Sequence, residues 1–110
     1  MEIWKNIDGF NGKYQVISWG RVRNAETGNI LMPYKNKKGY LKIGLSDGHG
    51  KSLKFRVNRL VAISFIENPN NYPQVNHKDG NKENNSFTNL EWVTDEGNKK
   101  HAKCMRKGDI

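Results

Sequence analysis

The sequence predicts a small α+β protein, in which an antiparallel β module precedes a helix and a short strand–loop–strand–helix unit. Three stretches support this fold class. Residues 40–45 alternate in character, which is the period of a strand with one buried face. Residues 57–66 change to the spacing of an amphipathic helix. Residues 74–94 return to two short apolar segments on either side of a polar loop.

Turn signals divide the first half of the chain into short strands. Ser18, Trp19 and Gly20 form a turn-like joint inside "YQVISWGRVRN", and the glycine supplies conformational freedom there. "ETGN" is a second turn signal, and the apolar segment "NILMPY" follows it. "SDGHGK" indicates a hairpin loop before the return strand "SLKFRV". We therefore expect the β module, residues 1–55, to form one small antiparallel sheet.

The second half begins with a helix. It is expected from Val57 to Ile66, because apolar side chains recur three, four and eight positions after Val57, and the Asn-Pro step in "ENPNNYP" stops it. The strand "QVNH", a tight turn at Asp79 and Gly80, and the strand "NLEWVT" come next. Thr94 is the expected N-cap of a final helix that runs through "DEGNKKHAKCMRK".

The chain is strongly basic, with 19 Lys and Arg against 11 Asp and Glu and a net charge of +8. Such an excess is typical of a protein that binds a polyanion, and a basic surface that only aids solubility is the alternative. No apolar run approaches the ~20 residues that span a bilayer, so no membrane partner is expected. The single cysteine, Cys104, excludes an intrachain disulfide and fits a reducing, intracellular setting.

Polar residues near the chain's end could form a reactive site. His77 ends the first of the two late strands, and Asn98 and His101 share a face of the final helix. If that helix folds back across the hairpin, both can point toward Asn76 and His77. A neutral histidine can activate water, and Asn or Asp oxygens suit Mg²⁺ or Mn²⁺. A polar surface turn explains the same residues, and spacing alone leaves both interpretations open.

The stretch "VNHKDGNKENNSFTNLEWVTDEGNKKHA" resembles the core of the HNH endonuclease family, in the phage homing-type branch that includes intron-encoded nickases. "RVNRLVAISFIENP" resembles the helix that precedes that core. "WKNIDGFNGKYQVISWGRVRN" resembles an N-terminal module that often accompanies it. The resemblance covers essentially residues 3–103. It implies a ββα-metal nuclease unit within residues 56–110, joined to the β module of residues 1–55, which it marks as a DNA-contacting part.

The resemblance also implies roles for individual residues. His77 matches the general base, and Asn76 and Asn98 match the ligands of one divalent cation, Mg²⁺ or Mn²⁺. Asn89 matches a structural residue whose amide ties the loop together so that His77 points correctly. His101 is a supporting residue that would hold a phosphate or support the metal site. The implied reaction is metal-dependent hydrolysis of a DNA phosphodiester, with one site nicking one strand.

Double-stranded DNA is the expected partner, and the protein is expected in the cytoplasm, that of the host cell if it is phage-encoded. A phage or host DNA-processing protein is a further candidate partner, and the expected state is a monomer or weak dimer. Basic residues of the sheet half and the final helix are the expected phosphate contacts. These are Arg21, Arg23, Lys35, Lys37, Lys38, Lys42, Lys54, Arg56, Lys99 and Lys100.

A DNA-binding module with a decayed or regulatory HNH site is the alternative function. Two departures from the family pattern motivate it. Asn76 stands where homing-type nickases often carry aspartate, so the expected ligand pair has no charge. Asn58 stands where many relatives carry histidine, at a position expected to be structural or DNA-facing.

Overall fold

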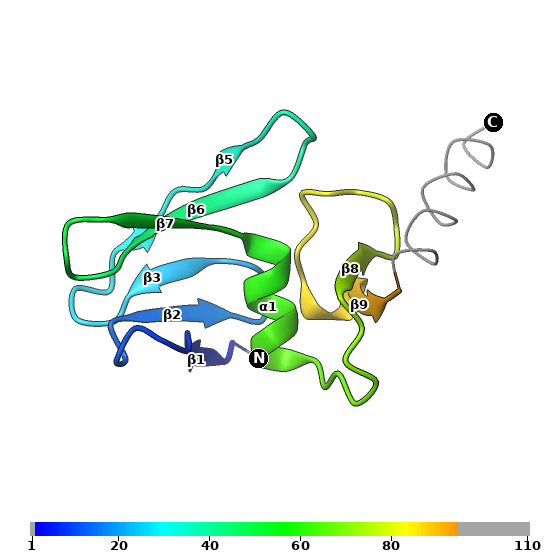
Figure 1. Cartoon of the computed structure of the whole chain (residues 1–110), viewed down its shortest axis with the longest axis horizontal. Coiled ribbons are helices and arrows are strands. Elements are labelled where there is room, and N and C mark those ends of the chain that lie inside the picture. The colour runs from blue at the N-terminus through cyan, green and yellow to red at the C-terminus, as the bar shows by residue number, and fades with distance from the viewer. Residues whose placement is uncertain (1, 95–110) are drawn as a thin grey trace.

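The computed structural model describes residues 2–94, and the expected final helix lies outside them. The described residues form three antiparallel sheets around one α-helix (Figure 1). This arrangement is the mixed α+β class that the sequence predicts. Within residues 2–94, no helix is both long enough and apolar enough to cross a membrane.

Two sheets, and not the expected one, occupy the first half of the chain. The first has the order β1-β2-β3-β4 and contains Trp4–Asn6, Tyr14–Ile17, Val22–Asn24 and Ile30–Leu31. The second has the order β5-β6-β7 and contains Tyr34–Lys35, Leu41–Ser46 and Ser52–Arg56. The single-sheet prediction was wrong because Pro33 lies between β4 and β5. Proline lacks the N–H that a continuing ladder needs.

Strand β6 has the alternation that its sequence indicates. Ile43 and Leu45 are buried. Lys42 pairs across the ladder with Arg56, and Gly44 pairs with Lys54. Because directly paired residues share a face, Lys42, Lys54 and Arg56 lie together on the side of the sheet that faces away from the core.

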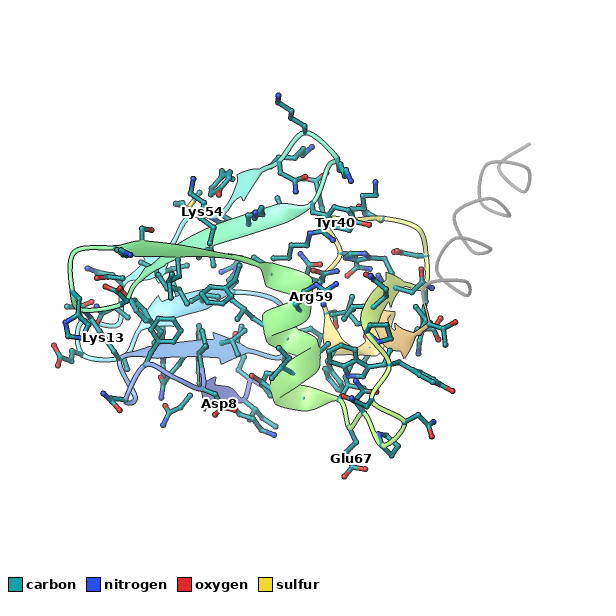
Figure 2. The ribbon with its side chains drawn as sticks, in the orientation of Figure 1. Asp8, Lys13, Tyr40, Lys54, Arg59 and Glu67 are labelled. Atoms are coloured by element: carbon teal, nitrogen blue, oxygen red, sulfur yellow. The ribbon has the colours of Figure 1, made fainter. Side chains whose placement is uncertain are left out.

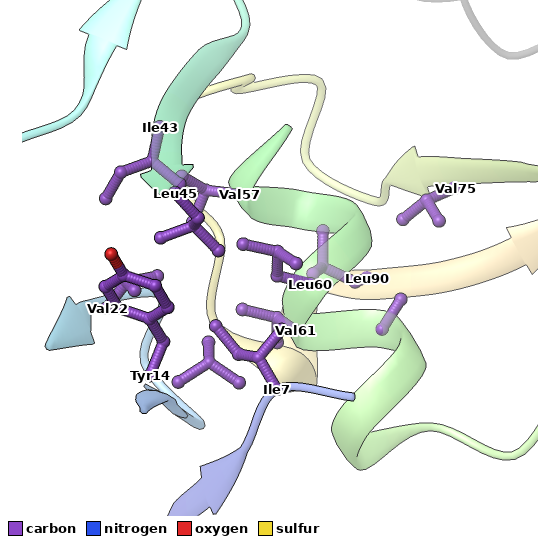
Figure 3. Close-up of a cluster of buried hydrophobic side chains, with 12 residues drawn as sticks. Ile7, Tyr14, Val22, Ile43, Leu45, Val57, Leu60, Val61, Val75 and Leu90 are labelled. Atoms are coloured by element: carbon purple, nitrogen blue, oxygen red, sulfur yellow. The ribbon is translucent and has the colours of Figure 1, made fainter. Parts of the chain in front are cut away.

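The helix α1, Val57–Phe65, follows β7 without a loop and contacts elements from both halves of the chain. Its end is closed by the Ile66 N–H, which donates to the Ala62 carbonyl at 3.0 Å. Figure 3 shows side chains from the first two sheets meeting α1 on one side, with Val75 and Leu90 on the other. The division at residue 55 stays a prediction, but the buried cluster draws on both sides of it.

The third sheet pairs β8, Gln74–His77, with β9, Leu90–Val93. A short 3-10 helix, Phe87–Asn89, leads into β9. The ladder places Asn76 opposite Glu91 and His77 opposite Leu90. The intervening loop, residues 78–86, therefore leaves from His77 and returns beside it. The sequence predicts both strands and this loop.

Candidate active site

His77 lies at the end of β8, where only 5% of it is exposed. Its Nε2 is 2.7 Å from Oδ1 of Asn85. An amide oxygen can only accept a hydrogen bond, so Nε2 carries the proton and donates it. The lone pair of the neutral ring is then on Nδ1. Asn85 is itself buried, with 3% exposure. Its hydrogen bond to Nε2 therefore holds the ring in one tautomer.

The environment of His77 favours the neutral ring. Burial lowers the pKa of His77 below its ordinary value, and the charge of Lys82 lowers it further. The hydrogen bond to Asn85 and the charge of Asp79 act in the opposite direction but do not reverse the change. Because the ordinary pKa is already about 6.5, the ring is mostly neutral at pH 7 and can accept a proton.

Asn89 holds the loop that follows His77. Its Nδ2 donates to Asp79 Oδ1 and to the Asn84 carbonyl, both at 2.9 Å. Its Oδ1 accepts from the Asp79 N–H at 3.1 Å, and its carbonyl accepts from the Lys78 N–H at 2.8 Å. One side chain thus ties the first residues of the loop to its last ones.

Asp79 belongs to the turn. Its Oδ2 accepts from Asn84 Nδ2 at 2.9 Å, and its Oδ1 accepts from the Asn81 N–H at 2.8 Å. The bond from Asn84 is the largest cause that lowers the pKa of Asp79, followed by the bond from the Asn81 backbone. The carboxylate is therefore engaged in holding the loop in shape next to His77.

Replacing Asn89 with alanine should destabilise the protein by about 3 kcal/mol, since three side-chain hydrogen bonds at roughly 1 kcal/mol each are lost. Replacing it with aspartate should cost at least as much, because the new carboxylate would face that of Asp79. Thermal unfolding measures both effects. Ser86→Ala is the control, because the Ser86 hydroxyl contacts only Thr88 in the described part of the chain, at 3.0 Å. Equal melting temperatures for all four proteins would contradict the bracing role.

Asn76 is 6% exposed and its Nδ2 donates to Glu91 Oε1 at 3.0 Å. A carboxylate can only accept, so the NH₂ end of the amide must face Glu91 and the Oδ1 end is turned away from it. An amide oxygen is a ligand of the kind that Mg²⁺ and Mn²⁺ accept. Within residues 2–94, no group of three or more His, Cys, Asp or Glu could hold a metal. Of the two predicted metal ligands, Asn76 is the one that lies within the described residues, and its amide oxygen is of a kind that suits a hard cation. Asn98 and His101 lie outside the described residues.

Three residues of this site were not assigned a role from the sequence. Asn85 holds His77, Glu91 orients Asn76, and Gly20 packs against Asn85. A Cβ built on Gly20 would lie 2.8 Å from the Asn85 Cβ. Strand pairing could have placed Glu91 opposite Asn76. No local pattern connects Gly20 with Asn85.

The predicted phosphate contacts lie on two sheets. Lys42, Lys54 and Arg56 share the outer face of the second sheet. Arg23 lies instead on the first sheet, where its guanidinium carbon is 4.0 Å from the centre of the Trp4 ring. The other described members are exposed at or near turns: Arg21, Lys35, Lys37 and Lys38. The Lys35 Nζ is 3.3 Å from a carboxylate oxygen of Glu83. Lys99 and Lys100 lie outside the described residues.

Asn58 cannot face DNA, because only 3% of it is exposed. It belongs to the buried side of α1. Within residues 2–94 its Oδ1 has no hydrogen-bond partner. Of the two expectations for this position, the structural one is correct.

Two segments of the chain match known protein families. Residues 2–46 match the NUMOD4 motif, and residues 67–100 match the model described as HNH endonuclease. The chain therefore contains an HNH endonuclease domain and a NUMOD4 motif. This confirms the resemblance stated from the sequence, and the HNH match contains the hairpin that positions His77.

Relatives share both parts. The HNH chain is 50% identical over 91 residues to the DNA endonuclease I-HmuI of Bacillus phage SP01, covering 83% of this chain and 52% of that protein. It is 43% identical over 99 residues to the uncharacterized HNH endonuclease L245 of Acanthamoeba polyphaga mimivirus, covering 90% and 29%. A solved structure, "DNA binding and cleavage by the HNH homing endonuclease I-HmuI", has a TM-score of 0.84 and 44% identity, covering 98% of this chain and 60% of that one. The chain thus spans about half or less of these curated relatives.

Proposed function

We propose that this HNH protein is a metal-dependent DNA endonuclease that nicks one strand by hydrolysing a phosphodiester. The observation that carries the proposal is the buried His77 ring, whose Nε2 lies 2.7 Å from Oδ1 of Asn85 and whose pKa is lowered by burial. The similarity to I-HmuI supports DNA as the substrate, because that protein is named a DNA endonuclease and its structure concerns DNA binding and cleavage.

The chain's own groups can perform the proton transfer. Nδ1 of His77 takes a proton from water, which then attacks phosphorus. Asn85 keeps the ring in the tautomer that this step requires, and Asn89 keeps the following loop in shape. Asn76, with Asn98, would hold one divalent cation. When bound, Mg²⁺ or Mn²⁺ supplies positive charge to stabilise the departing 3′ oxygen.

The partner in this proposal is double-stranded DNA, approached as a monomer or weak dimer in the cytoplasm of the cell that holds the DNA. A phage or host DNA-processing protein could recruit it. One site cuts one strand, so the product of a single encounter is a nick. Target sequence and the choice between the two metals are properties that cleavage experiments would assign.

Removal of metal should abolish cleavage. Supercoiled plasmid incubated with the protein and Mg²⁺ or Mn²⁺ should convert to open circles, and excess EDTA should stop this conversion. Agarose gels measure both forms. The competing function, a DNA-binding module with a decayed site, is motivated by the uncharged Asn76. It predicts shifted DNA mobility on native gels without any metal-dependent conversion, and that pair of results would refute the nuclease proposal.

Replacing Asn85 with leucine should reduce the nicking rate about 10- to 100-fold, the usual effect of removing a group that orients a reactive residue. The leucine keeps the branching of the side chain at Cγ but leaves the ring free to change tautomer. Single-turnover nicking measures the rate. Ser86→Ala is the control, because its hydroxyl is hydrogen-bonded to Thr88 and, in the described part of the chain, takes no part in holding His77 or the loop that follows it. Equal rates for Asn85→Leu and wild type would show that the bond to Nε2 does not matter.

A further inference from the structure

Tyr40 adjoins His77 and has two cations over its ring, and the mechanism above gives these three residues no role. The Tyr40 and His77 ring centres are 6.0 Å apart. The Arg56 guanidinium carbon is 4.2 Å from the centre of the Tyr40 ring, and Lys82 Nζ is 4.7 Å from it. Figure 2 shows Tyr40 next to the loop that joins β8 to β9. Tyr40 precedes β6 and Arg56 is the last residue of β7, whereas Lys82 belongs to that loop.

The backbone at Tyr40 and Arg56 and the side chain of Lys82 are held by hydrogen bonds. The Tyr40 backbone N–H donates to Asn36 Oδ1 at 3.0 Å, which fixes the start of β6. Arg56 is anchored by its pairing with Lys42 across the ladder. Lys82 Nζ donates to the Lys38 carbonyl at 2.7 Å, so the loop and the second sheet meet here. The cluster is therefore a built junction between the two halves of the chain.

The charge of this junction is not neutralised by the described part of the protein. Within residues 2–94, the one ion pair joins Lys35 to Glu83, so neither Arg56 nor Lys82 faces a carboxylate there. Contacts with an aromatic ring are worth only ~0.5–1 kcal/mol at exposed sites, and two cations over one ring repel each other. An anion bound near both cations would offset the repulsion. Guanidinium and ammonium groups together are the pair that proteins use for phosphate.

We propose that Tyr40, Arg56 and Lys82 form a phosphate-binding site, which holds a DNA phosphate adjacent to the one hydrolysed at His77. Tyr40 acts as a positioning residue, because its ring fixes both cations beside the base. The placement of this phosphate site next to the hydrolysed phosphodiester rests on the proposed function of His77. Phosphates of one strand follow one another at about 3.4 Å along the helix axis. A site one ring away from His77 therefore holds a near neighbour of the reacting phosphate.

Salt dependence of DNA binding tests the site without any cleavage. A short duplex is titrated with the full chain in EDTA at several salt concentrations, for wild type and for Arg56→Gln with Lys82→Gln. The slope of log K against log[salt] should become shallower in the double variant by about 0.9 for each phosphate that the protein no longer neutralises. Lys13→Gln is the matched control, because Lys13 also lies over a tyrosine, 5.6 Å from the Tyr14 ring, at the far end of the first two sheets (Figure 2). A double variant with the wild-type slope would overturn the proposal.

Variants of Tyr40 test the positioning role. Tyr40→Phe keeps the ring and should keep the wild-type slope, whereas Tyr40→Leu should show part of the reduction in slope that the double variant shows. Equal slopes for Tyr40→Phe and Tyr40→Leu would refute that role. Circular dichroism checks that each variant is folded, and Lys82→Gln alone serves if the Arg56 change disturbs the start of α1.

The place of the site is tested with DNA in which single phosphates near the nick are replaced by uncharged methylphosphonates. For the wild type, one methylphosphonate within a few nucleotides of the nick should weaken DNA binding more than the others. For the double variant, the same methylphosphonate should leave DNA binding unchanged. Identical position dependence in the two proteins would contradict the assignment. If the wild type never nicks but its salt slope still falls in the double variant, the endonuclease proposal fails and the phosphate site stands.

Discussion

His77→Ala is expected to abolish nicking of supercoiled plasmid while the protein still folds and binds DNA. A positioned general base contributes roughly 10²- to 10⁴-fold to rate, and no other histidine of residues 2–94 lies near the site. The change also leaves Oδ1 of the buried Asn85 without its donor, which should cost about 1–3 kcal/mol of stability. Gels measure open circles over time, and mobility shifts measure binding.

His49→Ala is the control for that experiment. His49 lies in the exposed loop between β6 and β7, and its side chain has no role in the proposed chemistry. It should nick at the wild-type rate. If His77→Ala nicks as fast as His49→Ala, another group activates the water, and the assignment of His77 as base fails.

Gly20→Ala should both destabilise the protein and slow nicking. Gly20 has a φ of 97°, where a side chain is strained by about 1–3 kcal/mol. The new Cβ would also lie 2.8 Å from the Asn85 Cβ and 3.0 Å from its carbonyl oxygen. Because a backbone atom cannot turn aside as a side chain can, Asn85 must shift. That shift moves the partner of His77 Nε2, so the damage reaches the candidate active site.

Gly28→Ala separates the two effects. Gly28 also has a positive φ, 76°, but a Cβ there meets nothing within 4 Å. It should lower the melting temperature through backbone strain alone and leave the nicking rate of the folded protein unchanged. Thermal melts and single-turnover nicking compare the two variants. Equal loss of nicking in both would show that contact with Asn85 is not the cause.

Local patterns sufficed for most elements of this fold. Apolar spacing predicted the helix that starts at Val57, and alternation predicted β6 with Ile43 and Leu45 inside. The split into two sheets at Pro33 was missed, because neighbouring short strands can join one ladder or two with the same turn signals.

The site was only partly predictable for a related reason. The family pattern assigned roles to His77, Asn76 and Asn89, but the loop around them is rich in asparagine. Several of these amides could have held the ring, and only the folded loop selects Asn85. The contribution of Gly20 depends on residues sixty-five positions away, which no periodicity connects.

The turn between β2 and β3 has a consequence for how such proteins evolve. The Ser18 carbonyl accepts a hydrogen bond from the Phe87 N–H at 2.8 Å, and Gly20 next to it packs against Asn85. Residues of the NUMOD4 match thus pack against the end of the loop that follows His77. A recombination event could fuse this HNH hairpin to an unrelated N-terminal segment in place of residues 2–46. Every residue of the HNH motif would then be kept, but the contacts that Ser18 and Gly20 make with the loop would be lost. Exchange of the N-terminal segment should therefore preserve the contact with Asn85 only when the incoming segment also has a glycine at this turn.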